Sequence, residues 1–230
     1  MSFGFSTYNQ TTRMVKDMKR FIVSATVLAM LFAMVWQAEA GLIINNAGFE
    51  SPVLTDGAFT VVFIPSWGIT GGNAGVFNPQ SIHITGEAPE GQNVGYSDAG
   101  DISQVLSDAL SIGDYTLQVE VGDRKDVNFP AYKVQLLAGG NLLAEDNNSL
   151  LPNDGFLTST VTYTALASDA NLGQSLEIRL IHSGGSSQQI EWDDVRLDFV
   201  AIPEPSTFLL LLAGILGVLG IGWRRRRKAA

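Results

Sequence analysis

Short stretches of alternating apolar and polar residues constrain the fold of this chain more than any other feature. The run "SLEIRLI" places Leu176, Ile178 and Leu180 on one face of an extended strand, and "YTLQVEVG" at residues 115–122 alternates in the same way. A period of two residues is typical of half-buried strands, whereas an amphipathic helix repeats every three to four residues. The central part of the chain is therefore predicted to form β-strands.

Clusters of turn-forming residues separate these runs, among them "SWGITGGNAG", "AGGN", "EDNN", "LPNDG" and "SGGSS". Glycine, asparagine, aspartate and proline favour tight turns, and many short strands joined by such turns are typical of antiparallel sandwiches and barrels. We expect an all-β fold, an antiparallel β-sandwich, over residues 41–200.

The N-terminus has the layout of a secretory signal. Basic residues precede the apolar stretch 21–36, and "AEA" ends at Ala40. A charged region, an apolar region and a small-x-small cleavage site predict a signal peptide at 1–40 that the Sec machinery exports and that is cut after Ala40. Met18 is an alternative true start, and a retained N-terminal anchor is the alternative to cleavage.

The C-terminus predicts a membrane anchor. A linker at 201–206 leads into an uncharged stretch at 207–223, and a basic tail at 224–230 follows. That length is just sufficient for a helix to cross the hydrocarbon core, and the basic tail marks the cytoplasmic side. A transmembrane helix at 207–223 and a precursor anchored in the inner membrane are expected, with the sandwich outside.

The order of elements in this tail is similar to the PEP-CTERM sorting signal of bacterial exported proteins. The signal consists of Pro203, Glu204 and Pro205, the apolar span, and the arginine cluster Arg224, Arg225, Arg226 and Arg227. The resemblance implies an exosortase-type membrane protease as a partner. It also implies that the mature protein lies at the cell surface or in the extracellular matrix of a bacterium.

Charge excludes one class of function. Residues 41–202 contain five basic and 20 acidic residues, a formal charge of −15, and the chain has no cysteine. A surface of this sign repels nucleic acid, so no nucleic-acid partner is expected. An exported domain without disulfides needs another restraint on its loops, and an acidic surface favours divalent cations.

A change of phase in the stretch "IEWDDVRLDF" predicts a β-bulge. Ile190 and Trp192 alternate in one phase, while the apolar residues from Val195 onward alternate in the other. Both sets face the core only if the strand gains one residue at Asp193 and Asp194. A bulge presents carboxylate and carbonyl oxygens together, which are calcium ligands. A structural calcium ion is one interpretation, and solvated acids on edge strands are the other.

A second resemblance covers the whole predicted domain. The opening residues Asn46, Gly48, Phe49 and Glu50, the later Trp67, and the closing "WDDV" at 192–195 are similar to the galactose-binding-like jelly roll of several carbohydrate-binding modules. The resemblance implies a jelly roll whose first and last strands meet around a structural calcium ion. The residues that match the family's ligands are Glu50 and Asp194, with Asp193 beside them and carbonyls of 86–91 as further donors.

The motifs indicate no catalytic chemistry. The two histidines, His83 and His182, have no catalytic spacing, and the sequence contains no phosphate loop, zinc pattern or nucleophile elbow. We therefore expect a protein that is not an enzyme and that binds a glycan or extracellular polysaccharide, with no ligand-binding residue assigned. A structural matrix or adhesion protein without a small ligand, and an unrecognised hydrolase, are the alternatives.

Overall fold

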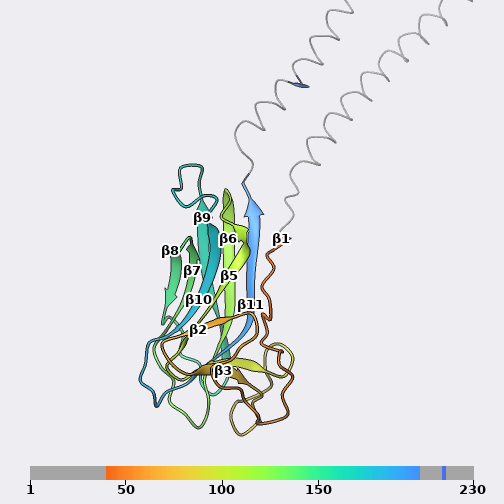
Figure 1. Ribbon diagram of the computed structural model, residues 1–230, viewed down its shortest axis with the longest axis vertical. Helices are drawn as coiled ribbons and strands as arrows, with labels where there is room; N and C mark the ends of the chain where they lie inside the picture. The colour runs from red at the N-terminus through yellow and green to blue at the C-terminus, as the bar shows by residue number, and fades with distance from the viewer. Residues whose placement is uncertain (1–39, 203–213, 216–230) are drawn as a thin grey trace, which may run out of the picture. The chain divides into compact units, whose positions relative to one another are not determined.

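The computed structural model describes residues 40–202 and 214–215. In the described part of the chain, residues 40–201 form eleven β-strands (Figure 1). They are β1 (Ala40–Gly41), β2 (Gly68–Thr70), β3 (Ala74–Phe77), β4 (Val94–Ser97), β5 (Asp101–Ala109), β6 (Gly113–Gly122), β7 (Tyr132–Ala138), β8 (Asn141–Asn147), β9 (Phe156–Ala165), β10 (Ser175–His182) and β11 (Ile190–Ala201).

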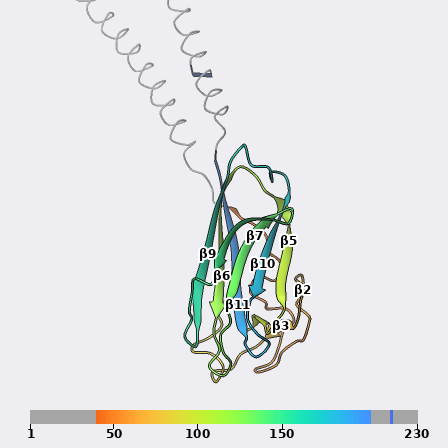
Figure 2. The same ribbon diagram turned by 90° about the vertical axis from the view of Figure 1, so that its left-hand side faces the viewer.

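The strands form two antiparallel sheets that face each other (Figure 2). One sheet has the order β3-β4-β11-β6-β9, with the short β1 also paired to β11, and the other has the order β2-β5-β10-β7-β8. The predicted all-β sandwich is confirmed. Strands distant in sequence become neighbours, since β4 pairs with β11 and β5 with β10.

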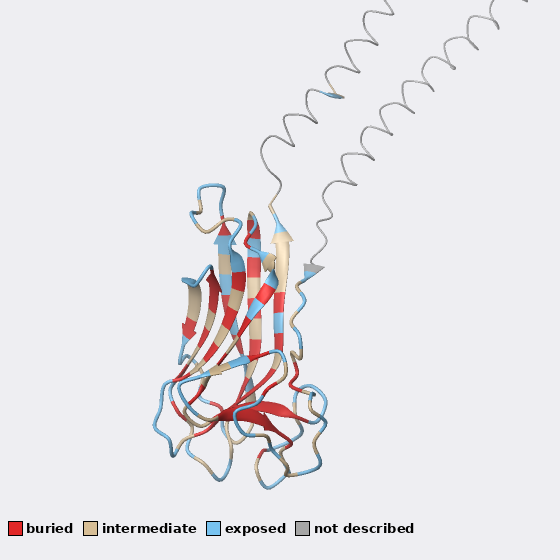
Figure 3. Ribbon diagram, viewed as in Figure 1, coloured by how far each residue is buried: buried red, intermediate tan, exposed pale blue. Residues whose placement is uncertain are grey.

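The alternating runs supply the core between the two sheets. Buried residues recur along the strands of both sheets (Figure 3). Leu176, Ile178 and Leu180 of β10 are completely buried, as are Leu117, Val119 and Val121 of β6. Trp192 of β11 is also completely buried, and its indole nitrogen donates a hydrogen bond to the Ser97 hydroxyl at 3.1 Å. Burial of such side chains is the main favourable contribution to folding.

One buried carboxylate ties β7, β8 and β9 together. Asp146 accepts hydrogen bonds from the Tyr132 hydroxyl at 2.9 Å, the Ser159 hydroxyl at 2.6 Å and the Ser149 amide at 3.0 Å. Burial pushes the pKa of Asp146 up, but the hydrogen bonds from Ser159, Ser149 and Tyr132 outweigh burial, so its pKa is lowered. Asp146 is thus held as a structural anion.

The predicted bulge is present in β11. The register of β11 against β6 shifts between Asp193 and Arg196, and Asp194 has a φ of 44°, in the left-handed region. The amide of Val195 donates to the carbonyl of Ala47 at 3.2 Å, which joins the bulge to the first segment of the domain. The change of phase in the sequence therefore marks a real irregularity of the strand.

Both ends of the domain leave the sandwich side by side. Ala40 pairs with Phe199 and Gly41 with Asp198. Within the described residues, no helix is both long enough and apolar enough to span a membrane. The predicted signal peptide, transmembrane helix and basic tail, including Pro203 to Pro205 and Arg224 to Arg227, lie outside the described residues, apart from Gly214 and Ile215 within the predicted span.

Candidate active site

A second, smaller apolar cluster lies on the outer face of the six-stranded sheet. It consists of the buried residues Phe77, Val94 and Tyr96, with Ala88 and Phe156 packed against it. These side chains belong to β3, β4, β9 and the segment that joins β3 to β4. Both faces of this end of the sheet are therefore covered, so a polar residue that points outward from it is also buried.

Glu191 is that polar residue. Its neighbours Ile190 and Trp192 point into the main core, so the Glu191 side chain points to the outer face, where it lies between Tyr96 on β4 and Gly122 on β6. Its exposed fraction is 0%, and both carboxylate oxygens are buried without a hydrogen-bond partner among the described residues. A buried carboxyl group with no donor is costly when it is charged.

The environment of Glu191 therefore favours its protonated form. Burial raises the pKa of Glu191 well above its usual value, and the carboxylates of Asp123, Asp126 and Asp98 raise it further, while only the Arg124 charge opposes them. A protonated carboxyl group beside aromatic rings can deliver a proton to a bound substrate.

Gly122 makes the close packing around Glu191 possible. A Cβ atom at position 122 would lie 2.4 Å from Cε1 of Phe156 and 2.8 Å from Cβ of Glu191. Because real Cβ contacts are never this short, only glycine lets the Phe156 ring approach the acid.

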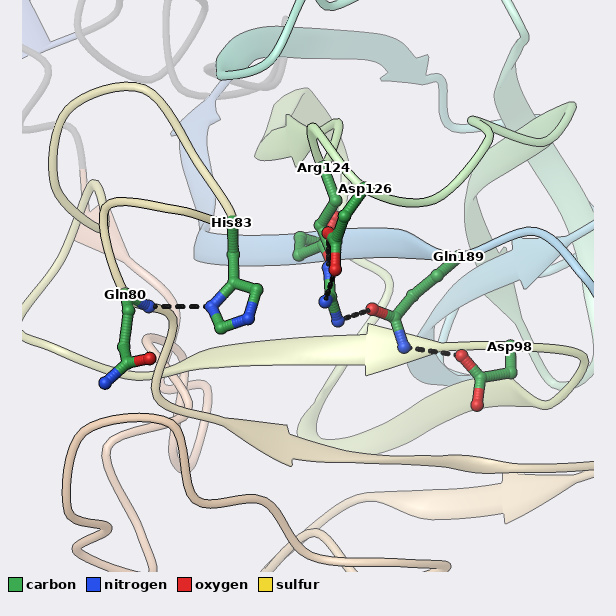
Figure 4. Close-up of polar contacts among 7 residues, drawn as sticks. Gln80, His83, Asp98, Arg124, Asp126 and Gln189 are labelled. Atoms are coloured by element: carbon green, nitrogen blue, oxygen red, sulfur yellow. Dashed lines mark hydrogen bonds and ion pairs between the residues drawn. The ribbon is translucent and has the colours of Figure 1, made fainter.

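Arg124 lies in the loop after β6, with its side chain beside those of Asp126 and Gln189 (Figure 4). Its Nε atom lies 3.9 Å from Oε1 of Glu191, longer than a hydrogen bond. The guanidinium instead donates to Asp126 at 2.9 and 2.7 Å and to the side-chain oxygen of Gln189, which in turn donates to Asp98. These contacts hold Arg124 beside Glu191 without forming a close ion pair.

Aromatic groups surround the same point. The guanidinium carbon of Arg124 lies 4.9 Å from the centre of the Phe77 ring, and the His83 ring packs edge-on against Phe77 at 5.1 Å. Nδ1 of His83 accepts a hydrogen bond from the Gln80 amide at 3.0 Å. Burial, followed by the Arg124 charge, lowers the pKa of His83 against the opposing effect of Asp126. His83 is thus favoured in its neutral form.

The predicted calcium residues lie around a different point of the same face. Oε1 of Glu50 accepts the amides of Gln92 and Asn93 at 2.8 and 2.7 Å, and Oδ2 of Asp193 accepts the amide of Glu90 at 2.8 Å. Two of the three predicted ligands therefore flank one loop. Asp194 points elsewhere, since its Oδ2 lies 3.1 Å from an Arg196 guanidinium nitrogen.

The donors near this loop match calcium in chemical type. Glu50 and Asp193 offer carboxylates, and Asn93, which is 2% exposed, has a buried side-chain oxygen without a partner among the described residues. Burial, the largest influence, raises the pKa of Asp193 to about 8, so a nearby cation would relieve a real cost. Within the described part of the chain, no group of three or more histidine, cysteine, aspartate or glutamate side chains is placed to hold a metal ion.

Comparison with known families identifies the class of the domain. The HpiC1 cyclase family model (HpiC1-like) matches residues 40–198, most of the chain, so the chain belongs to this cyclase family. The PEP-CTERM protein-sorting motif matches residues 201–227, which confirms the predicted sorting signal. No curated protein matches.

Solved structures give particular relatives. A Stig cyclase, Fisc, from Fischerella sp. TAU, in complex with (3Z)-3-(1-methyl-2-pyrrolidinylidene)-3H-indole, is 32% identical with a TM-score of 0.65; the match covers 72% of this chain and 100% of that one. A cyclase from Fischerella sp. TAU, in complex with 4-(1H-indol-3-yl)butan-2-one, is 33% identical with a TM-score of 0.64, over 71% and 100% of the two chains. Carbohydrate-binding modules also match, at 16 to 18% identity and TM-scores of 0.42 to 0.43, a likeness of fold alone.

These relatives correct the prediction that the protein is not an enzyme. Family and structures both indicate a cyclase fold, so the expectation of a non-catalytic protein was wrong. The error has a physical cause, because the candidate site is assembled from residues far apart in sequence. Glu191 could have been singled out from its phase, opposite to Ile190 and Trp192, but no pattern indicated that loops would bury it.

Proposed function

We propose that the protein is an exported cyclase that closes a ring on an unsaturated, indole-like substrate, with Glu191 as the general acid. The observation that carries the proposal is the buried carboxyl group of Glu191, which has no donor among the described residues and lies beside Tyr96 and Phe156, in a chain of a cyclase family. The ligands of two relatives, both indole derivatives, suggest the substrate class.

The proposed chemistry is an isomerisation. Glu191 donates its proton to a carbon–carbon double bond, which leaves a carbocation at the adjacent carbon. A second π-bond of the substrate attacks this cation, so one carbon–carbon bond forms and one π-bond is lost. The resulting cation then loses a proton to the Glu191 carboxylate, which restores the acid, and no oxidant or reductant is needed.

The residues around Glu191 support this chemistry. The aromatic rings exclude water, which would otherwise capture a carbocation, and their π-faces favour positive charge. Tyr96 is fixed in place because its hydroxyl donates to the carbonyl of Thr60 at 2.6 Å. The chain thus supplies a proton at one oxygen and an apolar surface around it.

Isotope exchange tests the proposal. The sandwich domain is a suitable sample, because relatives matched over 98 to 100% of their length have no more than this domain. Residues 41–202 would be incubated with a panel of indoles that carry an alkenyl chain. The expected product has the mass of the substrate in H₂O and one added deuteron in D₂O, with a new ring seen by NMR. Unchanged substrate throughout the panel would reject this function.

We also propose that Glu50 and Asp193 hold a structural calcium ion. Their attachment to one loop, and the unpartnered oxygen of Asn93, support this. Calcium would neutralise the buried carboxylate and join the first segment of the domain to the last strand. It takes no part in the proton transfer proposed above.

For the sorting motif, we propose processing by an exosortase and a final location at the cell surface or in the extracellular matrix. The match at residues 201–227 supports this. Protein recovered from the native cell surface should begin near Gly41 and end near Pro203 to Pro205. Mass spectrometry that finds Arg224 to Arg227 on the mature surface protein would contradict it.

A further inference from the structure

We propose that the guanidinium of Arg124 is a displaceable plug, which occupies the place on the Phe77 ring that an aromatic ring of the substrate takes on binding. The inference rests on the proposed function, because it assumes that the substrate binds beside Glu191. It assigns Arg124 as a residue that controls access to the site.

The Arg124 guanidinium is flat, like the aromatic ring of the substrate that would replace it. A guanidinium is planar and stacks on aromatic faces, and here its carbon lies 4.9 Å from the centre of the Phe77 ring. Phe77 is 5% exposed and the Arg124 side chain 13% exposed, so the ring is closed off while Arg124 stays in place. An indole needs the same flat contact.

The contacts that hold Arg124 can be released. Its charged partner, Asp126, has a side chain that is 47% exposed, and exposed ion pairs contribute little stability. The distance of 3.9 Å to Glu191 shows that the acid does not pin the guanidinium. A hollow of about 360 Å³, lined by Lys125, Asp126, Val127, Asn128 and Ser187, borders the carboxylate partner of Arg124.

Withdrawal of Arg124 would also suit the chemistry. A cationic intermediate beside Glu191 is repelled by a guanidinium only a few ångströms away, and the repulsion is strong where water is excluded. Ring closure is therefore disfavoured until the plug has moved. Substrate binding would therefore displace the Arg124 guanidinium and remove its positive charge in the same step.

Removal of the plug tests the inference by binding. The probe is 4-(1H-indol-3-yl)butan-2-one, the ligand of a relative. Arg124→Ala should bind it at least tenfold more tightly than the wild type, and Asp126→Asn, which only weakens the hold on Arg124, should show a smaller gain. Arg179→Ala is the matched control, because Arg179 makes a similar two-bond pair with Glu177 on the other sheet and should bind like the wild type.

Histidine NMR supplies a second readout. The chain has two histidines, and only His83 contacts Phe77. The probe should shift the His83 imidazole signals of the wild type toward their positions in ligand-free Arg124→Ala, while the His182 signals stay fixed. Equal or weaker probe binding by Arg124→Ala, or no binding by that variant, would overturn the inference.

The outcome separates the plug from the proposed function. Tighter binding by Arg124→Ala, with no alkenyl indole cyclised by any variant, would retain the plug and reject the function. Turnover by the wild type, with unchanged affinity of Arg124→Ala for the probe, would support the cyclase function and reject the role of Arg124 as a plug. If Arg124→Ala fails to fold, Asp126→Asn decides the question alone, because the guanidinium is still present and only its hold is weakened.

Discussion

Asp146 and Glu191 are two acids that the same sandwich hides from solvent, with exposed fractions of 8% and 0%. Asp146 has three donors aimed at its oxygens, whereas Glu191 has none in the part of the chain that the structure describes. The pKa of Asp146 is lowered and that of Glu191 is raised. Burial alone therefore does not decide what a hidden carboxyl group does; its donors determine whether it serves as a fixed anion or as a source of protons.

The largest effect should follow from replacing the acid without donors. Glu191→Gln removes the proton that a general acid supplies, so turnover should fall by roughly 10²- to 10⁴-fold. Below about pH 4, where Glu191 is protonated in both the folded and the unfolded state, its free energy of unfolding should change by less than about 1 kcal/mol, because Glu191 has no hydrogen bond to lose among the described residues. Steady-state kinetics and thermal melting measure the two effects. Glu87→Gln, which alters an exposed acid, should leave both unchanged; equal loss of activity in the two variants would contradict the assignment.

Calcium should have the next largest effect, on stability. Binding to the folded state alone contributes about 2.7 kcal/mol when calcium is at a hundredfold its Kd. Melting of residues 41–202 in calcium and in EDTA, at matched ionic strength, should differ by several degrees. Glu50→Gln or Asp193→Asn should remove most of the difference. Identical melting temperatures for the wild type in the two buffers would exclude the site.

A smaller loss of stability is expected when Asp146, the acid with three donors, is changed. Asp146→Asn keeps the shape of the side chain but removes charge-assisted hydrogen bonds, which contribute about 2 kcal/mol to folding. The free energy of unfolding in urea should fall by about that amount. Tyr132→Phe, which removes one of the donors, should cost less. A fully stable Asp146→Asn would show that the donors do not matter.

The smallest effects concern pH, and they have opposite signs. The lowered pKa of Asp146 means that its contribution to stability is present above about pH 4 and is lost as the pH falls through its folded value. The raised pKa of Glu191 means that its contribution is complete below about pH 4 and is lost as the pH rises through its folded value, where activity also declines. The free energy of unfolding and the turnover rate would be measured as functions of pH for the wild type, Glu191→Gln and Asp146→Asn. The difference between each variant and the wild type gives the sign of that residue's pH dependence.

Alternation and turn residues were sufficient to predict the sandwich, because strand periodicity depends on local pattern. They also predicted the bulge at Asp193 and Asp194, since a change of phase is visible in a single strand. Trp67, one of the residues that carry the resemblance to the jelly roll, is buried, and its ring stacks on Phe49 with the ring centres 5.4 Å apart. These features depend on residues close together in sequence, or on one strand.

The candidate active site could not be predicted in this way. Arg124 follows a strand in the stretch "GDRKDVNFP" and has the pattern of an ordinary polar turn. Its position beside Glu191, 67 residues later, follows from the pairing of β6 with β11. The burial of Glu191 depends in addition on the segment between β3 and β4. A period of two indicates which face a side chain occupies, but not whether another segment covers that face.

The length of β11 has a consequence for how the protein is displayed. Glu191 lies near the start of this strand, and Ala201, from which the sorting tail continues, lies at its end. At about 3.3 Å per residue, the two are separated by about 33 Å of continuous sheet. Because the sorting tail continues from Ala201, a tether through this tail holds the domain at the end of β11 opposite to Glu191. Cleavage of the sorting tail would change where the protein is located and leave the residues around Glu191 unchanged.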